Sequence, residues 1–276
     1  MMKWTSTLTA LSLSVIGFSA LSAQDNNYQS ELTVSYMDFS SNKLDIDPTW
    51  GVQYSYYGSP ISQSASPYQL NRFLSQTSVL DLNYSNTDSN NTYGIAGKYV
   101  FDSKWFVGAN YQSTDTGSFG DADIYNVNLG YYLNEFTSVY VAATKTDSGN
   151  SRSAIIIDDY QYDIGIKSFI ETTYGEGVYF TADYSFSDDE IKTPIGTTKL
   201  DYRNWGVSVD YYLTNAFSIG GSYSDASYDN AEDTYAVNAA YFIRLVDNIS
   251  LSIRADKTLE PSSSGFSYDI GLVGRF

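Results

Sequence analysis

The sequence predicts an all-β chain that closes into a transmembrane antiparallel up-and-down β-barrel of about 14 strands, with roughly 12 to 16 strands compatible with the pattern. Segments of roughly 9–11 residues alternate apolar and polar side chains, which is the period of a strand. The chain has 27 Tyr and 14 Phe, and these aromatic residues recur at strand ends beside short turns. After its first residues, the chain has no run approaching the roughly 18 apolar residues that a membrane helix needs.

The first residues have the pattern of a secretory signal peptide. Lys3 supplies the positive charge, residues 8–21 are apolar with small side chains, and Leu21-Ser22-Ala23 offers a cleavage site before Gln24. A transmembrane anchor is the competing interpretation, but the run is short and no positively charged stop-transfer flank follows it. We therefore expect a signal peptide at residues 1–23 and one barrel domain at residues 24–276.

A repeated hairpin is the strongest internal evidence for the barrel. In each copy a strand with aromatic residues at its end leads into a polar turn, and an alternating strand returns. The four strand ends are Tyr99-Val100-Phe101, Tyr131-Tyr132-Leu133, Tyr211-Tyr212-Leu213 and Tyr241-Phe242-Ile243. An aromatic girdle at one membrane interface requires this placement, whereas a soluble β-sandwich gives no reason for it.

The other strands follow from the same alternation. The first three are expected at residues 31–39, 50–57 and 74–84, although the start of the third is ambiguous because Thr77 and Val79 share its polar face. The longest connection on this side is residues 58–72, and no connection is long enough to fold into the barrel as a constriction. We expect all five Pro residues to fall in loops or turns, because Pro cannot donate a ladder hydrogen bond. An even number of strands places both termini on one side, which we expect to be the periplasm.

The last strand, residues 266–276, ends the chain on an aromatic residue. Phe266, Ile270, Leu272 and Phe276 share one face, and the chain stops at Phe276. This ending resembles the C-terminal signature of bacterial outer-membrane barrels. The resemblance implies that Phe276 is a terminal signal for assembly.

Three segments together resemble one family. They are residues 66–75 (Ser-Pro-Tyr-Gln-Leu-Asn-Arg-Phe-Leu-Ser), residues 31–36 (Glu-Leu-Thr-Val-Ser-Tyr) and the terminal Phe276. They are similar to the putative general bacterial porins of Gram-negative bacteria. The resemblance implies an outer-membrane channel for passive diffusion of small hydrophilic solutes and ions, without catalytic residues. It also implies contact with outer-membrane lipid and lipopolysaccharide and with the barrel assembly machinery, and it leaves open whether the chain is a monomer or a homo-oligomer.

The composition excludes several kinds of chemistry. The chain has no His and no Cys, which removes imidazole and thiol nucleophiles, imidazole metal sites and thiolate zinc sites. The net charge of −17 disfavours nucleic acid as a partner. A carboxylate-pair hydrolase remains formally open, but no pair of Asp residues stands out by spacing. The acidic stretches at residues 187–190 and 225–233 lack the ligand spacing of a calcium loop and are expected to be solvated loops. We therefore expect no enzyme activity, no cofactor and no metal.

The polar faces of the strands supply the candidate pore lining. If the aromatic faces meet lipid, the charged residues that point inward are Asp81, Lys98, Asp159, Asp163, Lys167, Asp183, Asp210, Arg254, Asp256, Asp269 and Arg275. Seven are acidic and four are basic, which predicts a mild preference for cations. The alternative is a closed structural or adhesive barrel, filled by paired charges and by Tyr140, Tyr179, Tyr212 and Phe242.

Overall fold

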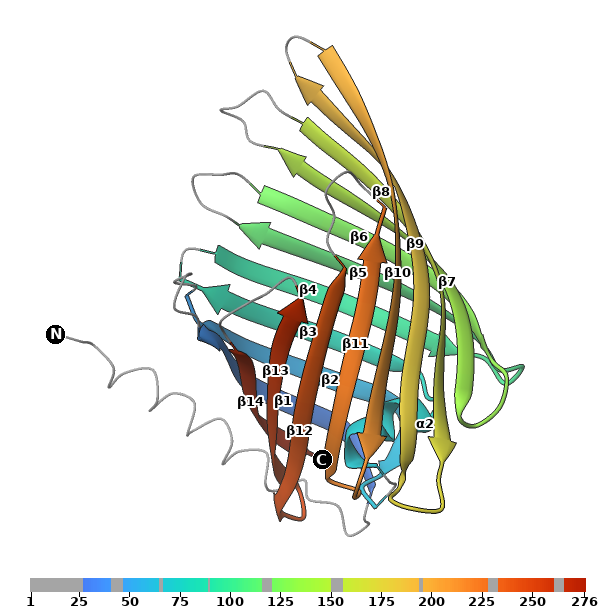
Figure 1. Ribbon diagram of the computed structural model, residues 1–276. Coiled ribbons are helices and arrows are strands. Elements are labelled where there is room, and N and C mark those ends of the chain that lie inside the picture. Colours follow the sequence, from blue (N-terminus) through green and yellow to red (C-terminus); the bar gives the residue numbers. More distant parts are fainter. Residues whose placement is uncertain are drawn as a thin grey trace, which may run out of the picture.

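Fourteen strands form one closed antiparallel barrel, which confirms the predicted fold class (Figure 1). The computed structural model describes residues 27–40, 47–64, 67–88, 90–115, 121–149, 156–193, 196–227, 233–260 and 266–276, so the predicted signal peptide lies outside the described residues. The strands are β1 (Asn27–Ser40), β2 (Thr49–Ser62), β3 (Val79–Thr87), β4 (Asn90–Val100), β5 (Trp105–Asp115), β6 (Asp121–Tyr132), β7 (Thr137–Gly149), β8 (Ile156–Glu171), β9 (Gly177–Thr193), β10 (Gly196–Tyr212), β11 (Phe217–Ala226), β12 (Thr234–Val246), β13 (Ile249–Glu260) and β14 (Phe266–Arg275).

Pairing of the first and last strands closes the barrel. Strands β1 and β14 are antiparallel, with a register that runs from Glu31 opposite Arg275 to Ser40 opposite Phe266. The terminal residue completes this seam: the carbonyl of Phe276 accepts hydrogen bonds from the backbone N–H groups of Gln29 and Ser30, at 2.7 and 2.8 Å. Lipid cannot satisfy an open strand edge, so closure satisfies every strand's backbone groups within the protein.

Both ends of the described chain lie at one end of the barrel, together with the short turns (Figure 1). We call this the turn end and the opposite end the loop end. Strand β4, for example, returns to β5 through a tight turn, in which the backbone N–H of Lys104 donates to the carbonyl of Phe101 at 2.9 Å. No helix among the described residues is long and apolar enough to cross a membrane.

The outward face carries two aromatic girdles with aliphatic residues between them. On six strands, two aromatic residues on the same face are separated by six positions; the pairs are Tyr93 and Tyr99, Trp105 and Tyr111, Tyr125 and Tyr131, Trp205 and Tyr211, Phe217 and Tyr223, and Tyr235 and Tyr241. Six residues of strand span about 20 Å. Neighbouring strands pair these rings within each girdle, with Trp105 5.2 Å from Tyr131 at the turn end and Trp205 4.8 Å from Tyr223 at the loop end. The sequence predicted the girdle at the turn end, and the structure adds the one at the loop end.

The strands are longer on one side of the barrel than predicted. Strands β8, β9 and β10 have 16, 17 and 17 residues. The acidic stretch at residues 187–190, which we expected to be a loop, lies within β9, where its backbone pairs with β10. Backbone pairing continues past the apolar band because the ladder does not need apolar side chains. The second acidic stretch, residues 225–233, lies partly outside the described residues.

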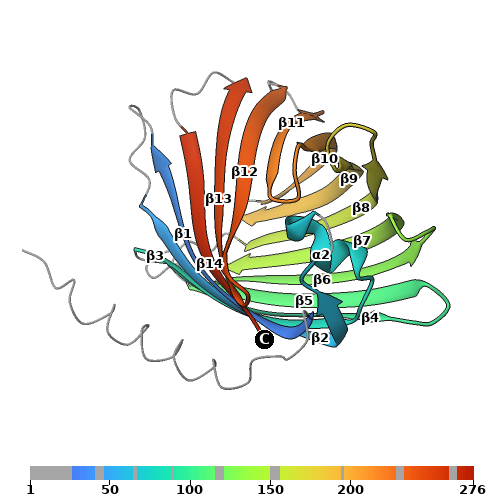
Figure 2. The same cartoon turned by 90° about the horizontal axis from the view of Figure 1, so that it is seen from below.

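The connection between β2 and β3 folds into the barrel. After Ser62 the chain forms a 3-10 turn, η2 (Tyr68–Leu70), and one helical turn, α2 (Asn71–Leu74), inside the turn end (Figure 2). We call residues 67–78 the inward segment. The prediction that no connection folds into the barrel is therefore wrong. The third strand begins at Val79 instead of residue 74, because Leu70, Phe73 and Leu74 find apolar partners inside the barrel instead of continuing a strand.

Arginine substitutions on β10 test the assignment of the two faces. Val207 and Val209 are 36% and 41% exposed on the outward face, whereas the hydroxyl of Ser208 lies 2.8 Å from that of Thr181 on the inward face. Val207→Arg or Val209→Arg should cost roughly 2–4 kcal/mol of insertion free energy, and Ser208→Arg should cost much less because it keeps access to water. The measurement is the folded fraction after refolding into lipid vesicles, read from gel mobility without heating. Equal losses for all three variants would contradict the assignment.

Candidate pore and its constriction

Apolar contacts hold the inward segment against the far wall of the barrel. Leu70 is buried in a cluster with Phe169 of β8 and Tyr212 of β10. The ring of Phe73 meets that of Tyr179 on β9 edge to face, with centroids 5.4 Å apart. These partners lie at least 90 positions away along the chain. The segment therefore crosses from the β2–β3 side of the barrel to the β8–β10 side.

Hydrogen bonds to two turns fix the segment at both of its ends. The backbone N–H of Tyr68 donates to the carbonyl of Asn215, in the β10–β11 turn, at 2.9 Å. The side-chain amide of Gln76 donates to the carbonyl of Asn134, in the β6–β7 turn, at 2.7 Å. Between them, the side-chain amide of Asn71 donates to the carbonyl of Ser62 at 3.2 Å. The segment is thus tied to three separate parts of the barrel, through one backbone and two side-chain donors.

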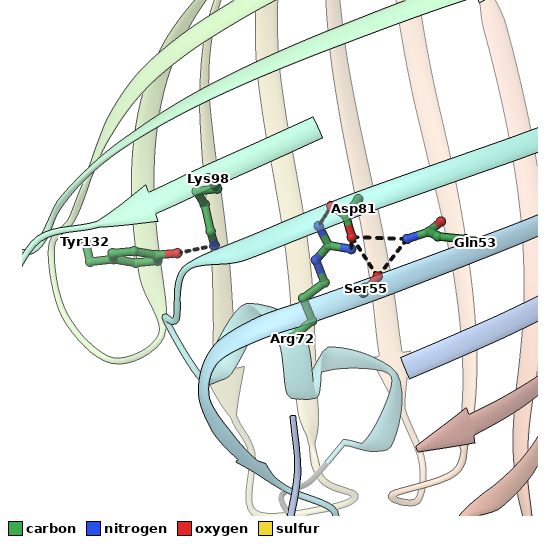
Figure 3. A network of polar contacts seen from close by, with 6 residues as sticks. All are labelled: Gln53, Ser55, Arg72, Asp81, Lys98 and Tyr132. Carbon is green, nitrogen blue, oxygen red and sulfur yellow. Dashed lines mark hydrogen bonds and ion pairs between the residues drawn. The ribbon is translucent and has the colours of Figure 1, made fainter. Parts of the chain in front are cut away.

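An ion pair joins the segment to the near wall. Arg72 binds the carboxylate of Asp81 through both Nη atoms, one of them 3.1 Å from Oδ1 (Figure 3). The hydroxyl of Ser55 also donates to Asp81 Oδ1, at 2.6 Å, and the amide of Gln53 lies 3.4 Å from the same atom. Asp81 is only 7% exposed, so these donors replace the water that its charge would otherwise need. The network orients Arg72 toward β3 and neutralises Asp81.

A cavity of about 590 Å³ remains beside the inward segment. Its wall is formed by residues of β3 to β9 and by the side chains of the segment itself. Five charged residues line it: Arg72, Asp81, Lys98, Asp163 and Lys167. The inward segment occupies the other side of the turn end, so this cavity is the remaining space at that end of the barrel.

The predicted lumen residues fall into two groups. Asp81, Lys98, Asp163 and Lys167 line the cavity. Asp210, Arg254, Asp256, Asp269 and Arg275 occupy inward positions on β10, β13 and β14, outside the lining of that cavity, and Asp183 lies on β9 opposite Gly165, close to Lys167 of the lining. The side chain of Asp159 lies outside the described residues.

Two of the predicted basic residues are engaged in ion pairs. Arg254 binds Asp256 at 2.9 Å. Arg275 binds Glu31 at 2.8 Å across the closing seam, and its guanidinium lies 4.7 and 4.8 Å from the ring centres of Tyr28 and Phe242. Both charges are therefore largely neutralised where they stand.

Three charged residues of the interior, Glu31, Arg72 and Arg244, were not predicted from the sequence; Arg244 lies on the inward face of β12, 5.6 Å from the ring centre of Tyr68. Glu31 was assigned to the first strand without a partner. Its partner, Arg275, lies 244 positions away and is brought to it by the pairing of β1 with β14. Arg72 was assigned to the connection at residues 58–72. A signal was present: Leu70, Phe73 and Leu74 are apolar residues in an otherwise polar connection, which indicates packing against the protein.

The alternative of a filled interior holds for part of the turn end. Tyr179 and Tyr212 contact the inward segment, and the ring of Phe242 lies 6.3 Å from that of Tyr68. Tyr140, by contrast, lines the cavity. Within the described chain, no group of three or more acidic residues is placed to hold a metal ion.

Substitution of Arg72 and Asp81 tests whether their ion pair holds the inward segment. Arg72→Gln or Asp81→Asn should each destabilise the barrel by about 1–3 kcal/mol, because each leaves a charged partner unmatched. The double variant should lose less than the sum of the two. The measurement is the temperature at which the folded gel mobility is lost, with Lys257→Gln on the outward face as the control. Additive losses would show that the two residues do not act together.

Comparisons with known proteins agree with this geometry. The family described as putative general bacterial porin matches residues 1–276. The crystal structure of outer membrane protein Omp33 of Acinetobacter baumannii shares the fold, with a TM-score of 0.59 and 19% identity over 92% of this chain and 100% of that one. A bacterial polysaccharide outer membrane secretin gives a TM-score of 0.54 and 12% identity over 90% and 99% of the two chains. No curated protein sequence matches. The chain, a 14-stranded outer-membrane barrel, belongs to the family of putative general bacterial porins.

Proposed function

We propose that this chain is a diffusion channel of the outer membrane for small hydrophilic solutes and ions. The observation that carries the proposal is the polar cavity of about 590 Å³ beside the inward segment, within a barrel of 14 strands. Barrels of about eight strands are filled by side chains, and barrels of 16–18 strands leave an aqueous channel. Here the inward segment narrows the turn end of the channel. No turnover is involved, and we expect no enzyme activity.

We propose a mild preference of this channel for cations. Three ion pairs, Arg72–Asp81, Arg254–Asp256 and Arg275–Glu31, each neutralise one acid and one base. Among the described inward residues, four carboxylates and three basic groups remain outside such pairs: Asp163, Asp183, Asp210, Asp269, Lys98, Lys167 and Arg244. With these four carboxylates ionised at neutral pH, the lumen carries an excess of negative charge.

The reversal potential across a salt gradient tests this preference. Cation preference should be largest near 0.01 M salt, where the Debye length is about 30 Å, and should fade near 1 M. Replacing Asp163, Asp183 and Asp210 together with Asn should weaken or invert it, because it removes three of the four remaining carboxylates. The control is Asp147→Asn, which removes a carboxylate that pairs with Lys145 near the loop end of β7. Anion preference in the unmodified protein, or indifference to the triple change, would contradict the proposal.

The alternative function is a closed structural or adhesive barrel. Apolar packing at the turn end favours it, since Leu70 and Phe73 pack against Phe169, Tyr179 and Tyr212 inside the barrel. Single-channel recording in a planar bilayer separates the two functions. Discrete conductance steps support the channel, whereas a silent bilayer containing correctly folded protein supports the closed barrel.

We propose the remaining steps of biogenesis from the sequence. Residues 1–23 act as a cleaved signal peptide, and Phe276 is read by the barrel assembly machinery. The position of Phe276 at the seam of β1 and β14 supports this role, because its backbone bonds to Gln29 and Ser30 of β1 form when the barrel closes. Deletion of Phe276 tests it, through the amount of folded protein in the membrane. The aromatic girdles would contact the lipid and the lipopolysaccharide, and the oligomeric state stays open.

A further inference from the structure

Two lysines face the cavity without a carboxylate partner. Lys98 donates one hydrogen bond, from Nζ to the hydroxyl of Tyr132 at 2.9 Å (Figure 3), and its Nζ lies 5.8 Å from the ring centre of Phe106. Lys167 lies 5.2 Å from the ring centre of Tyr140. Within the described chain neither lysine forms an ion pair. An ammonium group has three donors, so both lysines retain donors for a ligand.

The other charges of the cavity do not cancel these lysines. Asp81 is bound at both oxygens by Arg72, so this pair contributes no net charge. That leaves Asp163 as the one unpaired carboxylate among the described lining residues, and its Oδ1 accepts a hydrogen bond from the amide of Gln161 at 2.6 Å. The described lining residues therefore carry one net positive charge, within a protein whose formal net charge is −17, and Asp183 lies close to Lys167 just outside this lining.

Between the two lysines the wall presents neutral polar groups. Strands β5 and β6 contribute Asn110, Asn126 and Asn128 to the lining. The amide of Asn126 donates to Thr144 at 2.8 Å, which fixes its orientation. Lys98 on β4 and Lys167 on β8 are separated by four strand spacings, at most about 19 Å around the wall. Two extended lysine side chains reach across most of this span, so both ammonium groups can approach one carboxylate.

We propose that this cavity binds small hydrophilic carboxylates, with the carboxylate held by Lys98 and Lys167 and the neutral polar groups of the solute facing the asparagine wall. Its volume falls in the range of about 300–1,000 Å³ that is typical of sites for small molecules. The inference rests on the proposed channel function and names a class of solute that it retains. The excess of carboxylates elsewhere in the lumen sets the preference among small ions, whereas the lysine pair acts only on solutes that reach the cavity.

Three solutes of the same size and different charge test the site. The probes are glucuronate, glucose and glucosamine, titrated calorimetrically into the folded protein in a neutral detergent at low salt. Glucuronate should bind at least about tenfold more tightly than glucose, since a hydrogen bond to a charged group gives about that factor. Glucosamine should bind no better than glucose. Equal affinities for all three, or tighter binding of glucosamine, would overturn the proposal.

Matched variants locate the effect. Lys98→Gln with Lys167→Gln should abolish the advantage of glucuronate over glucose. Lys145→Gln with Lys257→Gln removes the same charge from the outward face and should leave the advantage intact. If the variant with Lys98→Gln and Lys167→Gln still binds glucuronate more tightly than glucose, these two lysines do not form the site. Folded gel mobility establishes that both variants are intact.

Calorimetry needs no ion current, so the result is independent of the channel function. Glucuronate binding in a protein that shows no conductance steps would support this site and contradict the proposed channel. Conductance steps without selective binding of glucuronate would support the channel and overturn this site. If both hold, glucuronate should interrupt the ion current at a lower concentration than glucose does.

Discussion

The structure depends on satisfying every backbone hydrogen bond within the barrel wall, because the apolar band of a membrane supplies no partners. Closure of β1 on β14 meets this requirement and fixes the register of all strands between them. Once the register is fixed, the period of two along each strand decides which side chains meet lipid and which meet the lumen. The aromatic girdles and the inward charges are both consequences of this single constraint.

Inside the barrel a different requirement applies, because buried charges need partners. Arg72 and Asp81 meet it with two charge-assisted hydrogen bonds, and Arg275 and Glu31 meet it at the seam. The first pair ties the inward segment to β3, and apolar contacts of Leu70 and Phe73 tie it to the opposite wall. The segment thereby divides the turn end into a filled part and an open part. The open part contains Lys98 and Lys167, which form no ion pair in the described chain. Packing of the inward segment therefore determines which part of the turn end presents positive charge to a solute.

Strand alternation in the sequence was sufficient to predict the barrel, its approximate strand number and the turn-end girdle. The girdle at the loop end was visible only after the register aligned residues such as Tyr111 and Tyr125, which lie on separate strands. The inward segment was missed because alternation carries no information about connections, and the mixed pattern at Thr77 and Val79 was taken as an irregular strand. Arg72 and Glu31 were missed for a related reason: their partners are set by the closed topology and not by local spacing.

The central claim is that the inward segment narrows a water-filled lumen at the turn end. The most direct test is the single-channel conductance of a variant in which residues 68–76 are replaced by a short Gly-Ser linker, compared with the unmodified protein in the same bilayer. Removal of the segment should increase the conductance, because the filled part of the turn end becomes accessible to water and ions. An unchanged conductance in a correctly folded variant would contradict the account.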